Sequence, residues 1–306
     1  MRILQLGCGR WGRNILRDLV ALRCAVTVVD PDPAARDAAA AAGAAQVLAA
    51  YAPTSVDGVV IATPASTHYD ELARFLDGST PVFVEKPLCD RTTHARAILA
   101  RARCPIQLMD KWRYHPAIRR LAAIARTGEL GAVIGLRTRR LQDGHAHTDT
   151  DAIWTLAPHD LDIARAILCH IPPLRSVCRE GTHAAAGVIA LFGDGDAGAR
   201  TPAASPWFAL EVSAMRPRRE REVALICSDG VAWLDDPEAM EIHVRRPGAR
   251  EPTDIVTHPT PGPQPLFAGL RACVEHLRGG PAPAGTLSEA VETVGILAAL
   301  HGEGER

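Results

Sequence analysis

The chain has 306 residues, of which 47% are hydrophobic and 23% charged, and its formal net charge is −1. These values are typical of a globular protein, and the length suits two domains. Because the charge is balanced and no apolar run reaches about 18 residues, the composition argues against a nucleic-acid-binding face or a transmembrane span, and we expect neither nucleic acid nor a membrane as a partner.

The sequence shows no leader segment before the first strand-like run, so we expect a cytoplasmic protein. The eight cysteines are scattered without C-x-x-C spacing, and in that compartment we expect them to be reduced and buried. The segment HAHTDTD places four possible metal ligands at alternate positions, namely His145, His147, Asp149 and Asp151. Nothing elsewhere pairs with this segment, so we favour a substrate-facing loop and predict no metal.

Strand-like and helix-like segments alternate over the first hundred residues. The run VDGVVIATP is apolar at almost every position, as expected of a parallel strand that is covered on both faces. Helical stretches separate the strands, which predicts right-handed βαβ units and an α/β fold with a doubly wound parallel sheet over 1–116. The expected strands are ILQLG, AVTVVD, QVLA, VDGVVIATP, PVFVEKP and IQLMDKWRY (106–114), and the expected helices cover 33–43, 68–78 and 93–103.

The glycines near the N-terminus have the spacing of a dinucleotide site. Gly7, Gly9 and Gly12 form G-x-G-x-x-G between a strand and a helix. The first glycine permits the tight turn, the second lets a pyrophosphate approach the backbone, and the third lets the helix pack on the strand. Asp30 ends the second strand, where a carboxylate can accept hydrogen bonds from both ribose hydroxyls. The alternative is a glycine-rich turn in an unrelated α/β protein.

The pattern changes after about residue 116. A helix is expected over 116–127, and later strand-like runs such as WFALEVSAM and REVALICSDG have short connections. Such runs predict an antiparallel sheet in a second, α+β domain over 117–306. The other expected features are a helix at roughly 158–169, a solvated hairpin at 216–222, a linker at 259–265, and closing helices over about 265–306 that pack back near the first domain.

Two strand ends in the first domain carry candidate functional residues. ATPASTHYD ends a buried strand at the edge of the sheet where ligands bind in this fold, and its Thr63, Pro64 and His68 are expected to touch the cofactor. The alternative is an ordinary strand exit in which Thr67 caps the next helix. In VEKP, Lys86 follows an apolar strand, where desolvation lowers a lysine pKa toward a value useful for proton transfer. The neighbouring Glu85 can offset part of the free-energy cost of burying the Lys86 ammonium. The alternative is that Lys86 forms a structural salt bridge at the strand end.

A third segment, DAIWTLAPHDLDIA, lies in the second domain. His159 is expected to open a helix beside Pro158, with Asp160 and Asp162 following. A histidine that faces a cleft from a helix start can orient or protonate a substrate oxygen. The alternatives are a capping histidine and a core histidine.

Together the motifs GCGRWGRN, VVD, ATPASTH, EKP, RYHPAIRRL and PHDLD resemble the glucose–fructose oxidoreductase / inositol dehydrogenase (Gfo/Idh/MocA) family, over about residues 1–170. The resemblance implies a Rossmann domain and an α+β domain with an open, mostly antiparallel sheet. That sheet forms one wall of the substrate cleft and often an oligomer interface. It also implies that Lys86 is the main proton-transfer residue and that His159 takes the family's histidine role. The sequence LAPHD is similar to that of the family's sugar-biosynthesis branch.

The sequence departs from the family pattern at two positions. Thr155 stands where the family commonly has an aspartate, and threonine is no base near neutral pH. Lys111 stands where relatives often have asparagine, and it would add a cation near the substrate. The candidate residues are catalytic Lys86, His159 and Thr155; cofactor-binding Gly7, Gly9, Arg10, Trp11, Gly12, Asp30, Thr63, Pro64, His68, Glu85 and Lys86; and substrate-binding Lys111, Arg113, Tyr114 and Asp160.

The resemblance implies an NAD(P)-dependent oxidoreductase that acts on a secondary alcohol or ketone of a sugar, nucleotide sugar or cyclitol. We expect NAD(H) to be favoured over NADP(H), because Asp30 repels a 2′-phosphate and neither Pro31 nor Asp32 offers a positive charge. We also expect a homodimer or homotetramer formed through the C-terminal sheet. The alternatives are an imine reductase on the same fold and a non-catalytic dinucleotide-binding sensor, which the missing aspartate favours.

Overall fold

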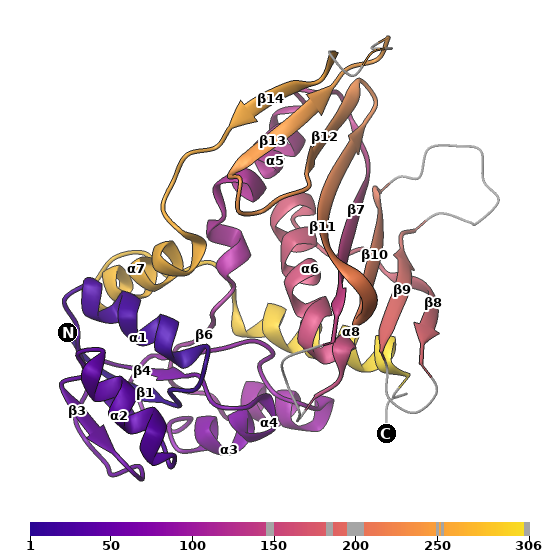
Figure 1. Cartoon of the computed structure of the whole chain (residues 1–306). Helices are drawn as coiled ribbons and strands as arrows, with labels where there is room; N and C mark the ends of the chain where they lie inside the picture. Colours follow the sequence, from indigo (N-terminus) through magenta and orange to yellow (C-terminus); the bar gives the residue numbers. More distant parts are fainter. Residues whose placement is uncertain (145–149, 182–185, 195–204, 249–250, 252–253, 303–306) are drawn as a thin grey trace. The chain divides into compact units, whose positions relative to one another are not determined.

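The computed structural model describes residues 1–144, 150–181, 186–194, 205–248, 251 and 254–302 (Figure 1). The chain forms two compact units. The first unit contains Met1–Lys111 and Gln264–Gly295, and the second contains Trp112–Pro263 and Ile296–Arg306. Each unit has a β-sheet of its own.

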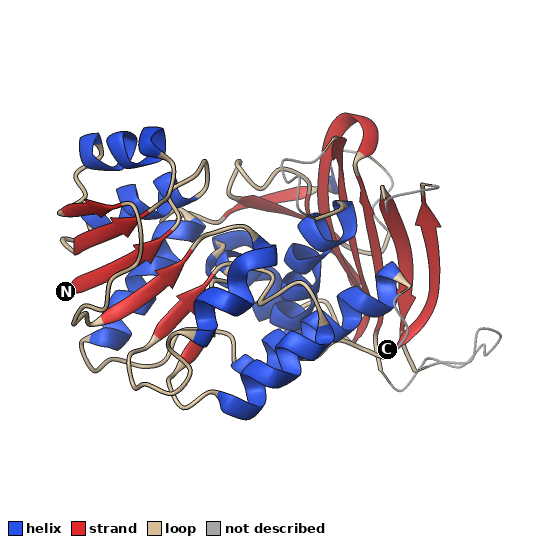
Figure 2. Cartoon of the chain, turned by 90° about the horizontal axis from the view of Figure 1, so that it is seen from below, coloured by secondary structure: helices blue, strands red, loops and turns tan. Residues whose placement is uncertain are grey.

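The first unit contains a six-stranded parallel sheet with the order β3-β2-β1-β4-β5-β6. Figure 2 shows helices on both faces of this sheet, so the predicted doubly wound α/β fold is confirmed. The strands are β1 (Arg2–Leu6), β2 (Ala25–Val29), β3 (Gln46–Leu48), β4 (Gly58–Ile61), β5 (Val82–Val84) and β6 (Ile106–Leu108). The helices are α1 (Gly12–Ala21), α2 (Pro33–Ala41), α3 (His68–Ala73), α4 (Thr92–Arg101) and α7 (Pro265–Leu277), with a 3-10 turn, η1 (Ala65–Thr67).

The core of this unit joins the two ends of the sequence. Helix α1 buries Ile15, Leu16 and Leu19, and α7 packs against it with Leu270 and Val274. Fully burying one such side chain stabilises a fold by about 1.5–3 kcal/mol. Helix α7 therefore helps to fix the position of α1 and of the glycine turn at its N-terminus. The two helices are far apart in the sequence: Leu266 of α7 follows Leu16 of α1 by 250 residues.

Two predicted elements of this unit are longer than the observed ones. The strand expected over 106–114 ends at Leu108, because the amides of Asp110 and Lys111 turn back to the carbonyls two residues earlier. The chain then forms a 3-10 helix, η2 (Lys111–Tyr114). The helix expected over 68–78 ends at Ala73 and continues as turns, in which the Gly78 amide donates to the Phe75 carbonyl.

The second unit contains an eight-stranded sheet with the order β14-β13-β12-β11-β7-β10-β9-β8. Strands β7 and β10 pair in parallel and every other neighbouring pair is antiparallel, which confirms the open, mostly antiparallel sheet. The strands are β7 (Val133–Asp143), β8 (Leu174–Glu180), β9 (Gly187–Phe192), β10 (Trp207–Ser213), β11 (Met215–Cys227), β12 (Gly230–Leu234), β13 (Glu241–Arg245) and β14 (Val256–Pro259). The edge strands β8 and β14 were not predicted, because their residues are mostly exposed and show no clean alternation.

Helices α5 (Pro116–Thr127) and α6 (Ala152–Leu168) pack on this sheet. As predicted, α5 ends at the left-handed Gly128. The predicted hairpin at 216–222 is wrong: these residues belong to β11, whose neighbours are β7 and β12. A last helix, α8 (Leu287–His301), contributes residues to both units. In the described part of the chain, no helix has the length and apolarity needed to cross a membrane.

Helix α6 begins earlier than the predicted start at about residue 158. The helix begins at Ala152, so His159 lies in its middle instead of opening it. Asp151 caps the helix by accepting a hydrogen bond from the Trp154 amide. Pro158 lies inside the helix, although proline usually breaks one. Because nearly every residue of α6 is buried, tertiary packing overrides the local preference of proline.

The cysteines are only partly as expected. All eight thiols are free. Six are buried, but Cys169 and Cys178 are exposed. Cys169 follows the last residue of α6 in a left-handed conformation, and Cys178 lies on the edge strand β8, so neither position is covered by the core.

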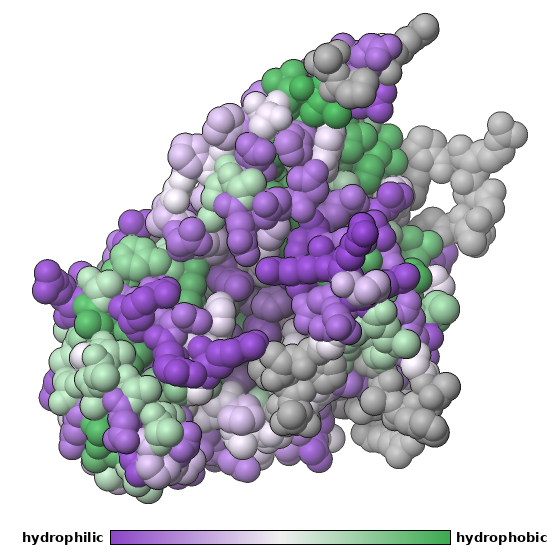
Figure 3. All heavy atoms as spheres, viewed as in Figure 1, coloured by the Kyte–Doolittle hydropathy of each residue, from purple (hydrophilic) through white to green (hydrophobic). Residues whose placement is uncertain are grey.

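The hydrophobic residues on the face drawn in Figure 3 form separate patches.

Candidate active site

The three glycines of the N-terminal turn meet different surroundings. A Cβ on Gly7, whose φ is +89°, would lie 2.7 Å from the Ala62 carbonyl oxygen, and one on Gly12 would lie 2.6 Å from the Gly7 oxygen. Packing therefore requires both glycines. A Cβ on Gly9 would meet nothing within 4 Å. The second glycine thus leaves an open space on the backbone, which fits the close approach of a pyrophosphate.

The neighbouring groups suit a dinucleotide as well. Helix α1 begins directly after this turn without a side-chain cap or an acidic residue in its first turn, so no side chain neutralises its partial positive charge, which favours an anion. The amides of Arg13 and Asn14 in the first turn donate to the Gly9 and Trp11 carbonyls. Asp30, 8% exposed, accepts hydrogen bonds from the amides of Cys8 (2.7 Å) and Asp32 (2.9 Å). These bonds fix the carboxylate at the end of β2, beside the glycine turn. Arg10 is exposed in the same turn.

A positive charge that sequence reasoning missed lies beside Asp30. The Nη1 group of Arg36 donates to the backbone carbonyls of Asp30 and Pro31, both at 2.8 Å. Pro31 and Asp32, the two residues that follow Asp30, carry no positive charge and gave no sign of this arginine. Arg36 lies in α2, four residues after Asp32, whose side chain caps that helix. An arginine one helical turn after a capping residue was the available signal.

The segment after β4 is tied to the EKP motif by His68. Its side chain is 1% exposed, with Nδ1 2.8 Å from the Pro87 carbonyl and Nε2 2.9 Å from the Thr63 carbonyl. The alternative in which Thr67 caps α3 is wrong, because its hydroxyl instead lies 2.9 Å from the Thr63 hydroxyl and 2.8 Å from the Pro64 carbonyl. His68 therefore holds the two candidate strand ends together.

The glycine turn, the EKP motif and Lys111 meet around Glu85. The indole Nε1–H of Trp11 donates to the Glu85 carboxylate at 2.7 Å, and the Lys86 amide donates to the same carboxylate at 3.2 Å. The Lys111 ammonium lies 4.5 Å from the centre of the Trp11 ring. Burial raises the pKa of Glu85, while Lys86, Trp11 and Lys111 act in the opposite direction. Lys86 itself is half-buried and precedes a cis peptide bond to Pro87.

The Trp11 contact gives a pH-dependent prediction. Its N–H stabilises the charged form of Glu85, so Trp11→Phe is expected to raise the pKa of Glu85 further. The stability difference between the parent and the variant should then be small where Glu85 is protonated and grow to about 1.5–3 kcal/mol as rising pH ionises it. Urea unfolding of both proteins across this pH range measures the difference. A difference that is independent of pH would contradict the contact.

In the second unit, Thr155 and His159 lie four residues apart on α6 and therefore on the same face of the helix. Thr155 is 8% exposed, and its hydroxyl lies 3.2 Å from that of Thr150. His159 is half-buried within a helix that is otherwise almost entirely buried. The His159 ring packs edge-on against Trp112, with the ring centres 6.3 Å apart.

The predicted substrate residues of this unit are largely engaged within it. The Asp160 carboxylate, 1% exposed, accepts a 2.5 Å hydrogen bond from Nε of Arg140. Arg113 donates to Asp162 at 2.6 Å. Tyr114 lies under the Arg119 guanidinium, 5.1 Å from its ring centre. Asp160 and Arg113 are therefore placed to position their neighbours.

The predicted loop HAHTDTD is only partly within the described residues. His145, His147 and Asp149 lie outside them. Asp151 is described, and its carboxylate lies 2.7 Å from Nε2 of His301. Among the residues that the structure describes, no group of three or more histidine, cysteine, aspartate or glutamate side chains is arranged to hold a metal ion.

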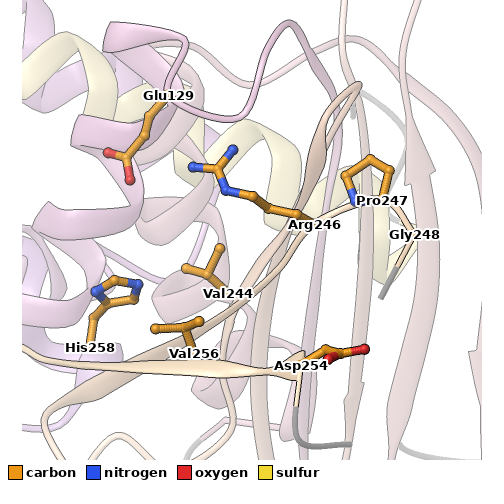
Figure 4. Close-up of a pocket in the computed structure, with 8 residues that line it drawn as sticks. All are labelled: Glu129, Val244, Arg246, Pro247, Gly248, Asp254, Val256 and His258. Atoms are coloured by element: carbon orange, nitrogen blue, oxygen red, sulfur yellow. The ribbon is translucent and has the colours of Figure 1, made fainter. Parts of the chain in front are cut away.

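A cavity of about 470 Å³ in the second unit contains none of the predicted site residues (Figure 4). It lies between the loop after α5 and the strands β13 and β14, and its charged groups have both signs. Its lining residues are Glu129, Val244, Arg246, Pro247, Gly248, Asp254, Val256 and His258. The candidate site is therefore defined by its chemistry and not by the size of this cavity.

Residues 1–104 match the family model of the Gfo/Idh/MocA group, described as an oxidoreductase family with an NAD-binding Rossmann fold. These residues are therefore assigned to the dinucleotide-binding domain of that family. The match covers the glycine turn, Asp30, Lys86 and the strands that carry them. The family assignment thus agrees with the local geometry of the first unit.

Curated relatives include two inositol dehydrogenases. The chain is 29% identical to "Inositol 2-dehydrogenase 2" of Saccharopolyspora erythraea over 184 residues, which are 55% of this chain and 54% of that protein. It is 43% identical to "Inositol 2-dehydrogenase 2" of Mycolicibacterium vanbaalenii over 91 residues, 28% of this chain and 26% of that protein. The chain spans about half the length, or less, of these relatives. UDP-N-acetylglucosamine 3-dehydrogenase GnnA from Acidithiobacillus ferrooxidans has the same fold, with a TM-score of 0.79 at 20% identity over 99% of this chain and 97% of that one.

Proposed function

We propose that the chain is an NAD(H)-dependent oxidoreductase that acts on a secondary alcohol or ketone of a sugar, nucleotide sugar or cyclitol. The observation that carries the proposal is the link from the glycine turn through Trp11 to Glu85, whose carboxylate also accepts the Lys86 amide; this link supports a position of Lys86 beside the proposed dinucleotide site. Relatives named for inositol and a UDP-sugar support a polyhydroxylated substrate. We further propose a cytoplasmic homodimer or homotetramer formed through the C-terminal sheet.

When bound, the nicotinamide ring accepts or supplies a hydride at the substrate carbon. Lys86 then moves the proton of the reacting hydroxyl, since an amine at a half-buried strand end can act as a general acid or base. His159 holds the same oxygen by a hydrogen bond. Thr155, on the His159 face of α6, supplies a neutral hydroxyl where the family commonly has an acid.

Thr155 favours a second candidate function, a dinucleotide-binding sensor without turnover. The two functions differ in one measurement. An oxidoreductase oxidises NADH in the presence of a ketosugar, or reduces NAD+ with myo-inositol, and the reaction is followed by NADH absorbance. A sensor binds NADH without either reaction.

The glycine turn provides a matched pair of variants that tests the dinucleotide site. Gly9→Ala adds a Cβ into open space, so we expect the melting temperature of the parent but at least tenfold weaker NADH binding, a change of about 1.4 kcal/mol. Gly12→Ala forces a Cβ against the Gly7 carbonyl and is expected to lose about 1–3 kcal/mol of stability. NADH fluorescence titration and thermal unfolding measure both effects. A Gly9→Ala variant that binds NADH like the parent would place the cofactor elsewhere.

Cofactor preference depends on Asp30 and Arg36. We expect at least a tenfold preference for NADH over NADPH in the parent, about 1.4 kcal/mol, because the Asp30 carboxylate repels a 2′-phosphate. Asp30→Ala removes this repulsion and leaves the Arg36 charge in place, so NADPH should bind more tightly. Asp30→Ala combined with Arg36→Ala should lose that gain. Fluorescence titration of the three proteins with both cofactors checks the order, and equal NADPH and NADH binding by the parent would contradict it.

A further inference from the structure

Two arginines lie directly opposite each other in the sheet of the second unit. Arg140 on β7 and Arg221 on β11 are register partners in an antiparallel pair, so their side chains share one face of the sheet. This is the face that α6 covers, because Arg140 is 5% exposed and contacts Asp160 of that helix. Like charges at directly opposite positions destabilise a sheet. Stability of the sheet therefore does not explain why two arginines occupy these opposite positions.

The protein supplies one carboxylate for these two charges. Asp160 pairs with Arg140. Arg221 makes no ion pair with the residues that the structure describes. It donates to neutral acceptors, the backbone carbonyls of Leu141 and Glu220 and the side-chain oxygen of Gln142. Burial and the positive charges of Arg140 and Arg219 lower the pKa of Arg221 to about 10, although the Asp160 carboxylate acts in the opposite direction.

The pair also has more N–H donors than the described residues accept. Two guanidiniums carry ten N–H donors, five on each. Five hydrogen bonds to described residues use half of them. A planar fork of N–H donors with an unbalanced positive charge is suited to a carboxylate or a phosphate, which it can bind through two parallel hydrogen bonds.

The pair lies close to the proposed catalytic histidine. Trp112 contacts both groups: its ring centre is 5.0 Å from the Arg140 guanidinium carbon and 6.3 Å from the centre of the His159 ring. Asp160, the partner of Arg140, is the next residue after His159. The positions of Arg140 and His159 are therefore fixed by the same two neighbours.

We propose that Arg140 and Arg221 bind an anionic group of the substrate, a carboxylate or a phosphate, so that the substrate is an acidic sugar derivative and not a neutral polyol. This assignment rests on the proposed function, because it takes His159 to face the reacting oxygen. It narrows the substrate class to uronates, sugar phosphates and nucleotide sugars.

Isothermal titration of the NADH-loaded full chain tests the proposal with three probes: glucuronate, glucose 6-phosphate and neutral glucose. We expect at least one anionic probe to bind at least tenfold more tightly than glucose, and the stronger of the two identifies the anionic group. Arg221→Met should reduce the affinity for that probe at least tenfold and leave glucose binding unchanged. Arg218→Met, an exposed arginine on the same strand, is the matched control and should bind like the parent.

The outcomes separate the two proposals. Failure of the parent to bind NADH contradicts the proposed function. Normal NADH binding together with no advantage of either anion over glucose overturns the anionic subsite, and so does an Arg221→Met variant that keeps the parent's anion affinity. If Arg221→Met does not fold, Arg221→Lys is used: it keeps the charge but loses the fork, and we expect anion binding that is weaker than in the parent but stronger than that of glucose. Parent-like binding by this variant would overturn the role of the paired N–H donors.

Discussion

Lys86→Met is expected to lose about 10²–10⁴-fold in kcat, the usual contribution of general acid–base catalysis, while its affinity for NADH stays close to that of the parent. Methionine approximates the length of the side chain but cannot carry a proton. The Glu85 carboxylate loses a neighbouring positive charge in this variant, but it keeps the Trp11 hydrogen bond that joins it to the glycine turn. The cofactor site should therefore remain formed.

The second lysine of the chain provides the matched control. Lys111→Met removes a cation from the same cluster, where it lies over the Trp11 ring. Because we assign Lys111 to substrate binding, this variant should raise KM with a smaller effect on kcat. Steady-state kinetics of both variants separates the two roles. Turnover of Lys86→Met within tenfold of the parent would make Lys86 a structural strand-end residue and would contradict the mechanism.

The features that the sequence predicted correctly are local. Gly7, Gly9 and Gly12 are defined by a turn of six residues, and the alternation of buried strands and helices is visible in windows of about ten residues. The end of α5 at Gly128 follows from one residue that adopts a left-handed conformation. In each case, the residues that decide the structure are neighbours in the sequence.

The features that could not be predicted depend on contacts between distant residues. The bond from Trp11 to Glu85 joins residues 74 positions apart. The opposition of Arg140 and Arg221 follows from a strand register that includes an irregularity between Met215 and Glu220. A one-residue change in that register would turn Arg221 to the other face of the sheet. The sequence therefore showed an arginine-rich segment but not the direction of its side chains.

Helix α6 shows how a local signal can mislead. Pro158 is a reasonable first residue of a helix, and it led to a predicted start at 158. The structure instead uses Asp151 as the cap. This earlier start places Thr155 on the helix, one turn before His159, which is the geometry that the proposed function uses.

Asp160→Ala is expected to cause the largest loss of stability among single changes in the second unit. The Asp160 side chain is 1% exposed, and the Arg140 side chain with which it pairs is 6% exposed. Removing one partner of a buried ion pair costs about 3–5 kcal/mol, because the remaining charge stays buried without compensation. Here the remaining charge also faces Arg221 across the strand pair, so the repulsion between the arginines adds to the cost.

Urea unfolding of three variants tests this prediction and identifies its cause. Glu238→Ala removes an acid from the exposed pair with Arg219, where the partners are 3.6 Å apart, and should change stability by less than about 1 kcal/mol. Arg140→Met combined with Asp160→Leu removes both buried charges and should recover most of the stability lost in Asp160→Ala, because the ion pair is removed as a whole and Arg221 no longer faces a second guanidinium. If the double variant were as unstable as Asp160→Ala, the loss would come from side-chain packing and not from an uncompensated arginine. Since Arg140 is also assigned to the anionic subsite, the double variant should regain stability without regaining the parent's affinity for the anionic probe.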